Sequence, residues 1–217
     1  MLKMTTEEFR LLVEAGHEIR NIEFKQPFKW SDDKSIWLRE RVIKGILGFS
    51  NTKDGGNIVI GVTEEGNSFI QLVGLSKAEI QSFSYDNIKG QIDSFGSSAV
   101  SFMVKEVEYN DKCFIVIQVG EFEELPIICK KDSQTRDIMR KGDIYCRLLS
   151  GNISTDKVTE KEMREIVEMA IDKGDRKLKE RGRIFCPFTS TYPSIDKGNR
   201  ETPKVEDFFN QQIKDLK

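Results

Sequence analysis

The chain has 217 residues, enough for one domain of ordinary size with an appendage, and 32% of them are charged. Its net charge of −2 argues against a protein that simply coats DNA, because such proteins are usually basic, whereas an enzyme with a carboxylate site fits this balance. No apolar run approaches the roughly 18 residues of a membrane span and the N-terminus lacks the apolar block of a signal peptide, so a cytoplasmic protein is expected.

The first quarter of the chain predicts alternating helices and strands. The last strand of this region is apolar on both faces, which is typical of a central strand covered on both sides. In the strand before it, the alternation places Ile22 and Phe24 on one face and Glu23 and Lys25 on the other. The elements are a helix capped by Thr5 or Thr6 and ended by Gly16, a strand over 21–25, the strongest helix from Asp32 or Asp33 to Phe49, and a strand over 57–62.

The remainder of the chain predicts a hairpin and further helices. This order of elements indicates an α+β fold, with a mixed β-sheet flanked by helices and a C-terminal helical appendage. The predicted elements are a strand over 69–73, a helix capped by Ser76 and running to about Phe95, a hairpin of 100–108 and 113–119 around Asn110-Asp111, an extended piece over 127–130, a strand over 144–148, and a long helix capped by Thr159 and running to about Lys179.

The character of the chain changes near its C-terminus. The main domain is expected to span 1–183, followed by a linker or draped loop over 184–202. Residues 203–217 predict an amphipathic helix whose apolar stripe includes Phe208 and Phe209. Since two adjacent phenylalanines favour burial, this helix is expected to dock on its own domain or on a second subunit.

An ordered set of short motifs gives the most specific signal. Taken together, the motifs resemble the Schlafen-type AlbA-like domain over about residues 5 to 170, although the acid after the I-G-V strand is usually Asp in that family. In chain order they are Glu18-x4-Glu23-Phe24-Lys25, Phe49-Ser50-Asn51-Thr52-x2-Gly55-Gly56, Ile60-Gly61-Val62-Thr63-Glu64, Val73-Gly74, and the closing strand Gly142-Asp143-Ile144-Tyr145-Cys146-Arg147.

The resemblance implies a metal site at Glu18, Glu23 and Glu64, holding Mg²⁺ or Mn²⁺. Carboxylates that converge repel one another, and a divalent cation relieves the repulsion and can activate water at a phosphodiester. The alternative is that each is a solvated surface acid. A separation of five residues places Glu18 and Glu23 on opposite faces of a straight strand, so convergence requires Glu18 to lie in a bend before it. Lys25 is expected either to contact the scissile phosphate or to form a cross-strand ion pair.

Two further groups are candidates for binding phosphate. The turn that contains Asn51, Thr52, Gly55 and Gly56 can present backbone N–H groups, although a ligand-free helix-to-strand turn explains the same residues. Arg147 is a phosphate ligand if it lies near the site and a rim salt bridge if it does not. A basic helix end can contact a phosphate backbone or simply be solvated; it contains Lys173, Arg176 and Lys177.

Two tryptophans flank the loop that follows the first predicted strand. Either indole can stack on a nucleobase. Core packing or interface burial is the expected role of Trp37, which lies on a helix, whereas the role of Trp30 stays open.

The leading functional hypothesis is a metal-dependent endoribonuclease of Schlafen type that acts on structured RNA such as tRNA. The alternative is a non-catalytic DNA-binding or ATP-binding regulatory module, although no Walker-type phosphate loop is present. Nuclease-active relatives line a positive valley with two similar lobes, and this chain has one lobe, so the resemblance implies a homodimer.

Overall fold

The computed structural model describes residues 2–14, 16–65, 69–135, 137–148 and 154–185. The chain divides into two compact units, residues 1–180 and 181–217. Most of the predicted linker and all of the predicted C-terminal helix lie outside the described residues. Within the described ranges, no helix has the length and apolarity needed to cross a membrane.

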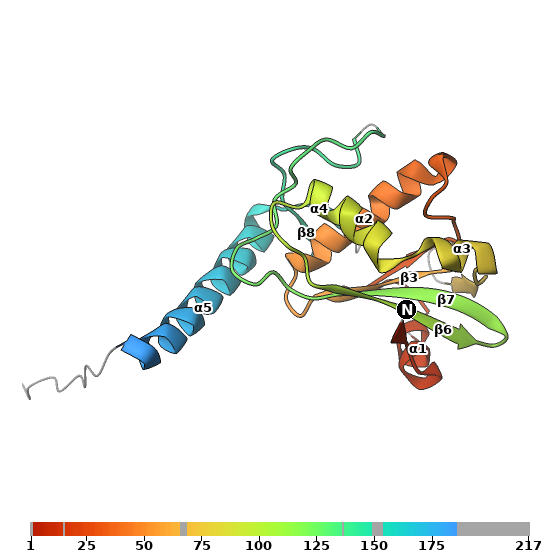
Figure 1. Ribbon diagram of the computed structural model, residues 1–217, viewed down its shortest axis with the longest axis horizontal. Helices are drawn as coiled ribbons and strands as arrows, with labels where there is room; N and C mark the ends of the chain where they lie inside the picture. Colours follow the sequence, from red (N-terminus) through yellow and green to blue (C-terminus); the bar gives the residue numbers. More distant parts are fainter. Residues whose placement is uncertain (1, 15, 66–68, 136, 149–153, 186–217) are drawn as a thin grey trace, which may run out of the picture. The chain divides into compact units, whose positions relative to one another are not determined.

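A mixed sheet of five strands is the centre of the first unit (Figure 1). The outer pairs β1–β6 and β3–β2 are parallel, whereas β6–β7 and β7–β3 are antiparallel. This arrangement confirms the predicted α+β class with a mixed sheet. The strands, in sheet order, are β1 (Leu2–Lys3), β6 (Phe102–Tyr109), β7 (Lys112–Val119), β3 (Gly56–Ile60) and β2 (Ile22–Lys25).

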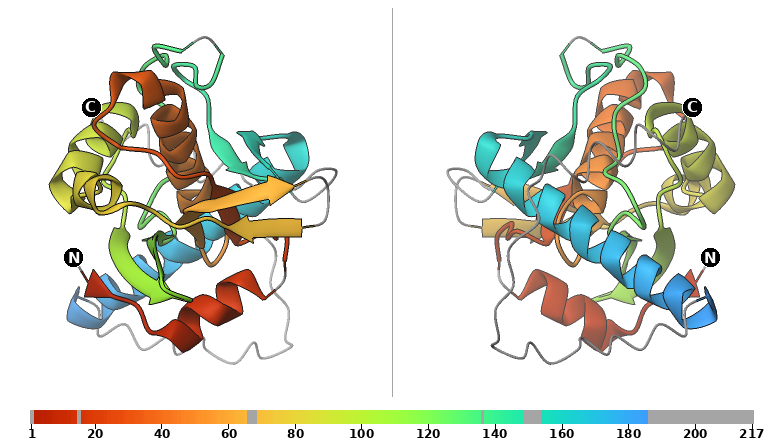
Figure 2. Two further views of the ribbon diagram at one scale, coloured as in Figure 1. Left: turned by 90° about the vertical axis from the view of Figure 1, so that its right-hand side faces the viewer. Right: turned by 90° about the vertical axis from the view of Figure 1, so that its left-hand side faces the viewer.

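Helices cover one face of this sheet, and a helix with a hairpin covers the other (Figures 1 and 2). Alternation along β3 explains the two cores, because Ile58 and Ile60 pack under the helices while Val59 packs against the opposite cluster with Phe9. The first face carries α2 (Ile36–Ser50), α3 (Lys77–Ser82), α4 (Tyr85–Phe95) and residues of α5 (Glu160–Phe185); the second carries α1 (Thr6–Val13) and the hairpin of β4 (Val62–Glu65) and β5 (Phe69–Leu72).

The single helix predicted from Ser76 to Phe95 is two helices in the structure. Ser76 caps α3 as expected, but α3 ends before Phe83, whose backbone leaves the helical region and whose ring is fully buried. Ser84 then caps α4 by accepting a hydrogen bond from the backbone N–H of Asn87. The break arises because a second capping serine and a core phenylalanine outweigh continued helical periodicity.

The predicted hairpin is confirmed, with Asn110 and Asp111 both at positive φ in its turn. Three short strands were not predicted: β1, β4 and β9 (Thr155–Lys157). The strand expected over 57–62 ends before Gly61, whose φ is +109°, and β4 begins after it. β9 pairs with β8 (Tyr145–Arg147), which is the closing strand of the motif set. Because β9 brings Thr155 to the candidate site, this omission affected the predicted site.

Candidate functional site

A bend before β2 brings Glu18 back onto the strand. The backbone N–H of Ile22 donates to the carbonyl of Ile19, which closes a turn directly after Glu18. The Oε1 of Glu18 then accepts a hydrogen bond of 2.9 Å from the backbone N–H of Phe24. The carboxylate of Glu18 therefore lies beside Glu23 despite the odd separation, in the bend that the sequence required.

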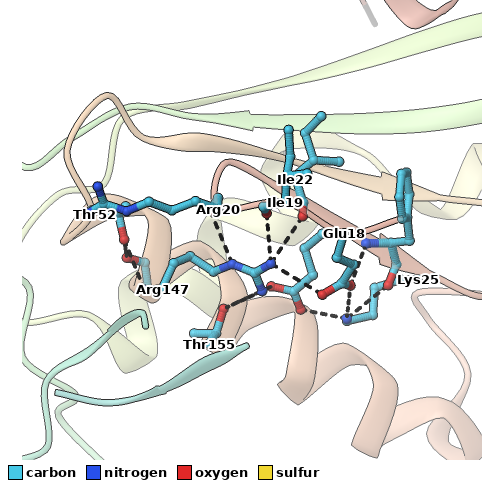
Figure 3. A network of polar contacts seen from close by, with 11 residues as sticks. Glu18, Ile19, Arg20, Ile22, Lys25, Thr52, Arg147 and Thr155 are labelled. Carbon is cyan, nitrogen blue, oxygen red and sulfur yellow. Dashed lines mark hydrogen bonds and ion pairs between the residues drawn. The ribbon is translucent and has the colours of Figure 1, made fainter. Parts of the chain in front are cut away.

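The guanidinium of Arg147 lies at the centre of the polar network (Figure 3). Its side chain is only 1% exposed, and its Nη atoms lie 3.3 Å from Glu18 Oε2 and 3.1 Å from Glu23 Oε2. Its remaining N–H groups donate to the backbone carbonyls of Ile19, Arg20 and Ile22. Partners within the protein thus neutralise the charge of Arg147 and accept hydrogen bonds from its N–H groups, so Arg147 is a buried ionic group and not a salt bridge at the rim.

Glu23 and Lys25 form the second part of the network. The Nζ of Lys25 lies 2.6 Å from Glu23 Oε1 and 3.9 Å from Glu18 Oε1, so the ammonium sits between the two carboxylates. The hydroxyl of Thr155 donates to Glu23 Oε2 at 2.9 Å. The four charged groups of the network, Glu18, Glu23, Lys25 and Arg147, balance one another.

Glycines in α2 allow this network to lie close beneath the helix. A Cβ placed at Gly45 would lie 3.1 Å from Glu23 Oε2, and one at Gly48 would lie 2.3 Å from the methyl group of Thr155. The absence of side chains at these positions therefore provides space for the carboxylate and for β9.

The two carboxyl groups differ in acidity. Burial raises the pKa of Glu18, against the opposing effect of the Lys25 charge. Burial would also raise the pKa of Glu23, but the charges of Lys25 and Arg147, with hydrogen bonds from Lys25 and Thr155, lower it below its usual range. Of two adjacent carboxyl groups whose pKa values shift in opposite directions, one can act as a proton donor while the other stays ionised.

The network opens into a cavity of about 260 Å³. Arg41 and Lys44 of α2 extend its basic lining, and Asp137 adds an acid. Lys44 pairs with Asp156 at 3.1 Å, whereas Arg41 has no ion-pair partner in the part of the chain that the structure describes. The cavity therefore presents carboxylates at its inner end with cations around them, an arrangement that can accept a phosphate group.

The predicted phosphate turn is engaged in internal contacts. The side-chain amide of Asn51 bonds to the backbone of Ile127 and Tyr145, and the hydroxyl of Thr52 bonds to Gly48 and to the N–H of Arg147. These bonds hold β8 against the end of α2. A phosphate-binding role for Asn51 and Thr52 stays a prediction.

The two glycines of this turn have packing roles. Gly55 has φ +64° and a Cβ there would lie 2.1 Å from the carbonyl oxygen of Val119, while one at Gly56 would lie 2.2 Å from the ring of Phe49. The neighbouring N–H of Asp54 donates to Glu121. Close approach of backbone and ring thus explains both glycines, and their proposed phosphate contacts stay untested.

The predicted basic helix end lies on α5. Lys173 pairs with Glu121 at 2.6 Å, Lys177 pairs with Glu124, and Arg176 donates to a backbone carbonyl of its own helix. Two of these three cations therefore have acidic partners within the domain, and a nucleic-acid role for them stays a prediction.

Glu64 lies in β4, where it pairs with Ile70. Its side chain lies outside the described part of the structure, so its expected approach to the other two acids stays a prediction. Among the side chains that are described, no group of three or more histidine, cysteine, aspartate and glutamate residues could hold a metal ion.

Arg41, Lys44 and Thr155 are among the residues of the cavity that were not predicted from the sequence. Arg41 and Lys44 are three residues apart on α2, a spacing that places them on one helical face and could have identified them. Thr155 follows the segment 149–153 and stands in a short polar strand with no apolar alternation, so the sequence gave no comparable signal.

Comparisons with known proteins assign the chain to a family. The family model described as "Schlafen, AlbA_2" matches residues 18–156, well over half of the chain. The chain belongs to this family, which confirms the resemblance carried by the motifs. No curated protein matches its sequence significantly.

Fourteen chains of known structure are matched in a structural comparison with this chain. One is the crystal structure of the DIP2311 protein from Corynebacterium diphtheriae, with 14% identity and a TM-score of 0.43, covering 70% of this chain and 29% of that one. Another is the N-terminal domain of a RecG-related protein from Nitrosomonas europaea, titled a putative ATP-dependent DNA helicase, with 18% identity and a TM-score of 0.39, covering 72% of this chain and 92% of that one. This chain therefore spans less than a third of the Corynebacterium protein.

Proposed function

We propose that this protein acts on nucleic acid as a metal-dependent endoribonuclease whose substrate is structured RNA such as tRNA. The observation that carries the proposal is the convergence of Glu18 and Glu23 with Lys25 at a cavity that Arg41 and Lys44 also line. Membership in the Schlafen AlbA_2 family supports the nucleic-acid part of the proposal. A phosphodiester needs cations to bind its oxygens and carboxylates for proton transfer or metal binding, and both lie here.

The carboxylates fit a hard divalent cation such as Mg²⁺ or Mn²⁺. Oxygen atoms of Glu18 and Glu23 face the Lys25 ammonium from two sides, so a cation in its place would be held by both carboxylates, with Glu64 as the third ligand of the proposal. Burial of Glu18 next to another carboxyl is a cost that such a cation would relieve. When bound, the metal would polarise the phosphodiester and activate water.

The chain's own residues supply the rest of the chemistry. Lys25 released from the carboxylates would contact the scissile phosphate, and Arg41 and Lys44 would hold neighbouring phosphate oxygens at the cavity. Burial raises the pKa of Glu18, whereas Lys25 and Arg147 lower the pKa of Glu23, so Glu18 accepts a proton more readily than Glu23 does. In this assignment Arg147 positions both carboxylates.

The test is cleavage of purified tRNA by the purified protein with Mn²⁺, with Mg²⁺ and with EDTA. Metal-dependent cleavage that falls at least about 100-fold in Glu23→Gln and Glu18→Gln supports the proposal. Glu108→Gln is the matched control, since Glu108 is exposed on β6 away from the cavity. Intact RNA under every condition, or cleavage that survives in Glu23→Gln, would overturn it.

One observation favours the alternative of a non-catalytic DNA-binding or ATP-binding module. Both oxygens of Glu23 already have partners, namely Lys25, Arg147 and Thr155, so the network is stable without a metal. The same basic cavity could then hold a phosphate of ATP or of DNA. A rise in melting temperature with ATP or DNA, and none with Mn²⁺, would favour this function.

We further propose that the active form is a homodimer, in which two copies of this single lobe line one valley. Light scattering of the purified chain gives its mass in solution, and twice the 25.0 kDa of the chain is the expected value. If the purified chain is a monomer and still cleaves tRNA, the homodimer proposal fails and the nuclease proposal stands.

A further inference from the structure

Trp30, whose role the sequence left open, is a core residue, whereas Trp37, for which the sequence favoured core packing or interface burial, lies outside the core. Trp30 is 2% exposed and packs against Phe28 and Phe83 in the core. Trp37, in the first turn of α2, is 39% exposed. A large indole is normally buried, so an exposed one beside a candidate site needs an explanation beyond packing.

Trp37 lines a second pocket, of about 240 Å³, next to the cavity of the charged network. The pocket also includes Phe24 and Val62, which are buried and apolar. Glu18, Lys25 and Arg41 line both spaces, so the two are contiguous through these three side chains. A pocket with an exposed indole among polar and charged side chains thus adjoins the charged cavity.

Arg41 connects the two pockets chemically. Its guanidinium carbon lies 5.3 Å from the centre of the Trp37 ring, within the range of a cation–π contact. Arg41 is exposed and has no acidic partner in the described ranges. Its charge is therefore available to an anion while its planar group lies over one face of the Trp37 ring.

We propose that Trp37 and Arg41 form a subsite for an unpaired nucleobase, whose adjoining phosphate binds at Lys25 and Arg41. A base has a flat apolar face that stacks on indole, and its phosphate requires a cation a few ångströms away. The pocket at Trp37 supplies the indole, and the adjoining cavity supplies the cations. The inference rests on the proposed function and deepens it: the strand is bound where a nucleotide is unstacked, such as a loop or a single-stranded end.

Gln26 adds a means of reading the base. It lines the same pocket, is exposed, and its amide makes no hydrogen bond in the part of the chain described here. A primary amide offers a donor and an acceptor side by side, which matches the edge of a nucleobase. Gln26→Leu is therefore expected to reduce differences in affinity between oligonucleotides of different base, while overall binding persists.

The test measures binding in EDTA, so that it does not depend on cleavage. The probe is a fluorescein-labelled oligouridine or oligoadenosine of ten nucleotides, followed by anisotropy. Trp37→Leu is expected to weaken binding about 5- to 150-fold, the range of one base–aromatic stack, whereas Trp37→Phe keeps most of the affinity. Tyr85→Leu is the matched control, because Tyr85 is an aromatic residue 46% exposed on α4 and lines neither pocket.

A second readout begins with the wild-type protein and needs only the conservative variant Trp37→Phe as its control. Oligouridine should quench the tryptophan emission of the wild-type protein, and the quenching should disappear in Trp37→Phe, in which buried Trp30 still emits. Arg41→Lys, which keeps the charge and loses the planar group, should weaken binding less than Trp37→Leu does.

The outcomes separate this inference from the nuclease proposal. If Trp37→Leu and Trp37→Phe bind and quench as the wild type does, the subsite is overturned even if tRNA is cleaved. If base-dependent binding requires Trp37 but no metal yields cleavage, the subsite stands and the nuclease function fails. Binding of an acidic peptide with no binding of RNA or single-stranded DNA would also overturn the subsite.

Discussion

The Nη1 of Arg147 lies 3.1 Å from Oε2 of Glu23, although the two residues are 124 positions apart in the chain. Both side chains are buried, with 1% and 6% of their surfaces exposed. This pair joins β8 to β2, and the same guanidinium bonds to backbone carbonyls of the bend before β2. The shape of the bend and the position of the closing hairpin therefore depend on one side chain.

Replacement of Arg147 should destabilise the protein strongly. Arg147→Met removes one of the two described cations that pair with Glu18 and Glu23, leaving Lys25, and removes donors from three backbone carbonyls. Loss of one partner from a buried ion pair typically costs about 3–5 kcal/mol in free energy of unfolding. Urea denaturation measures this change. The control is Arg140→Met, because Arg140 is 69% exposed and pairs only with Asp137; it should change stability by less than about 0.5 kcal/mol.

Alanine at two glycines should have opposite effects. Gly55→Ala should destabilise by at least about 1–3 kcal/mol, because its φ is +64° and the added methyl would meet the carbonyl of Val119. Gly90→Ala should instead stabilise by about 0.5–1 kcal/mol, since Gly90 lies in α4 with open space around it. Thermal unfolding of both variants distinguishes the two positions. Equal melting temperatures would contradict the packing role of Gly55.

Glu121 should contribute to the loss of stability in acid. It accepts a hydrogen bond from Asp54 and pairs with Lys173. Burial opposes its ionisation, but these partners outweigh it and lower the pKa of Glu121. A carboxyl with a lower pKa in the folded state stabilises above its unfolded pKa, and the contribution is lost as the pH falls through the folded pKa.

Glu121→Gln should therefore cost about 0.5–1 kcal/mol at pH 7, as for a partly solvated pair. The difference from the wild type should shrink as the pH falls below about 4.5. Urea denaturation across this pH range measures it, with Glu108→Gln as a control on an exposed strand position. A difference that stays constant with pH would show that Glu121 does not act through its charge.

Lys25 should compete with a divalent cation for the carboxylates. If Mn²⁺ binds where the ammonium now lies, Lys25→Met should bind Mn²⁺ at least about fivefold more tightly, because a competing charge worth about 1 kcal/mol is removed. The same variant should cleave tRNA more slowly. Calorimetric titration measures the affinity, and Lys44→Met, whose lysine pairs with Asp156, should change it less. Unchanged or weaker Mn²⁺ binding would contradict a metal site between Glu18 and Glu23.

The region from β2 to β3 could be predicted well from the sequence, because each element there carries a strong local pattern. The bend at Glu18 was also predictable, since two carboxyls five residues apart cannot converge on a straight strand. The burial of Arg147 was not predictable. An arginine on a short strand is usually exposed, and its partners come from a segment more than 120 residues away.

The tryptophans show a second limit of sequence patterns. Both flank the same loop, and the pattern around Trp37 indicates a helix without telling which part of that helix the sheet covers. In the first turn of α2, Leu38 packs in the core while the neighbouring Trp37 is exposed, and Trp30 folds back against Phe83. The sequence alone could not tell which of the two tryptophans is free to stack on a base, because that depends on where the helix lies relative to the sheet.

The close packing at Gly48 has a consequence for how the site can vary. The methyl group of Thr155 occupies the space where a side chain at Gly48 would be. The small size of Gly48 therefore allows the hairpin that carries Thr155 to approach α2 closely. A larger residue at Gly48 would displace Thr155 and so alter the shape of the cavity without any change in the charged residues, so natural variation at this one uncharged position could adjust which substrates enter.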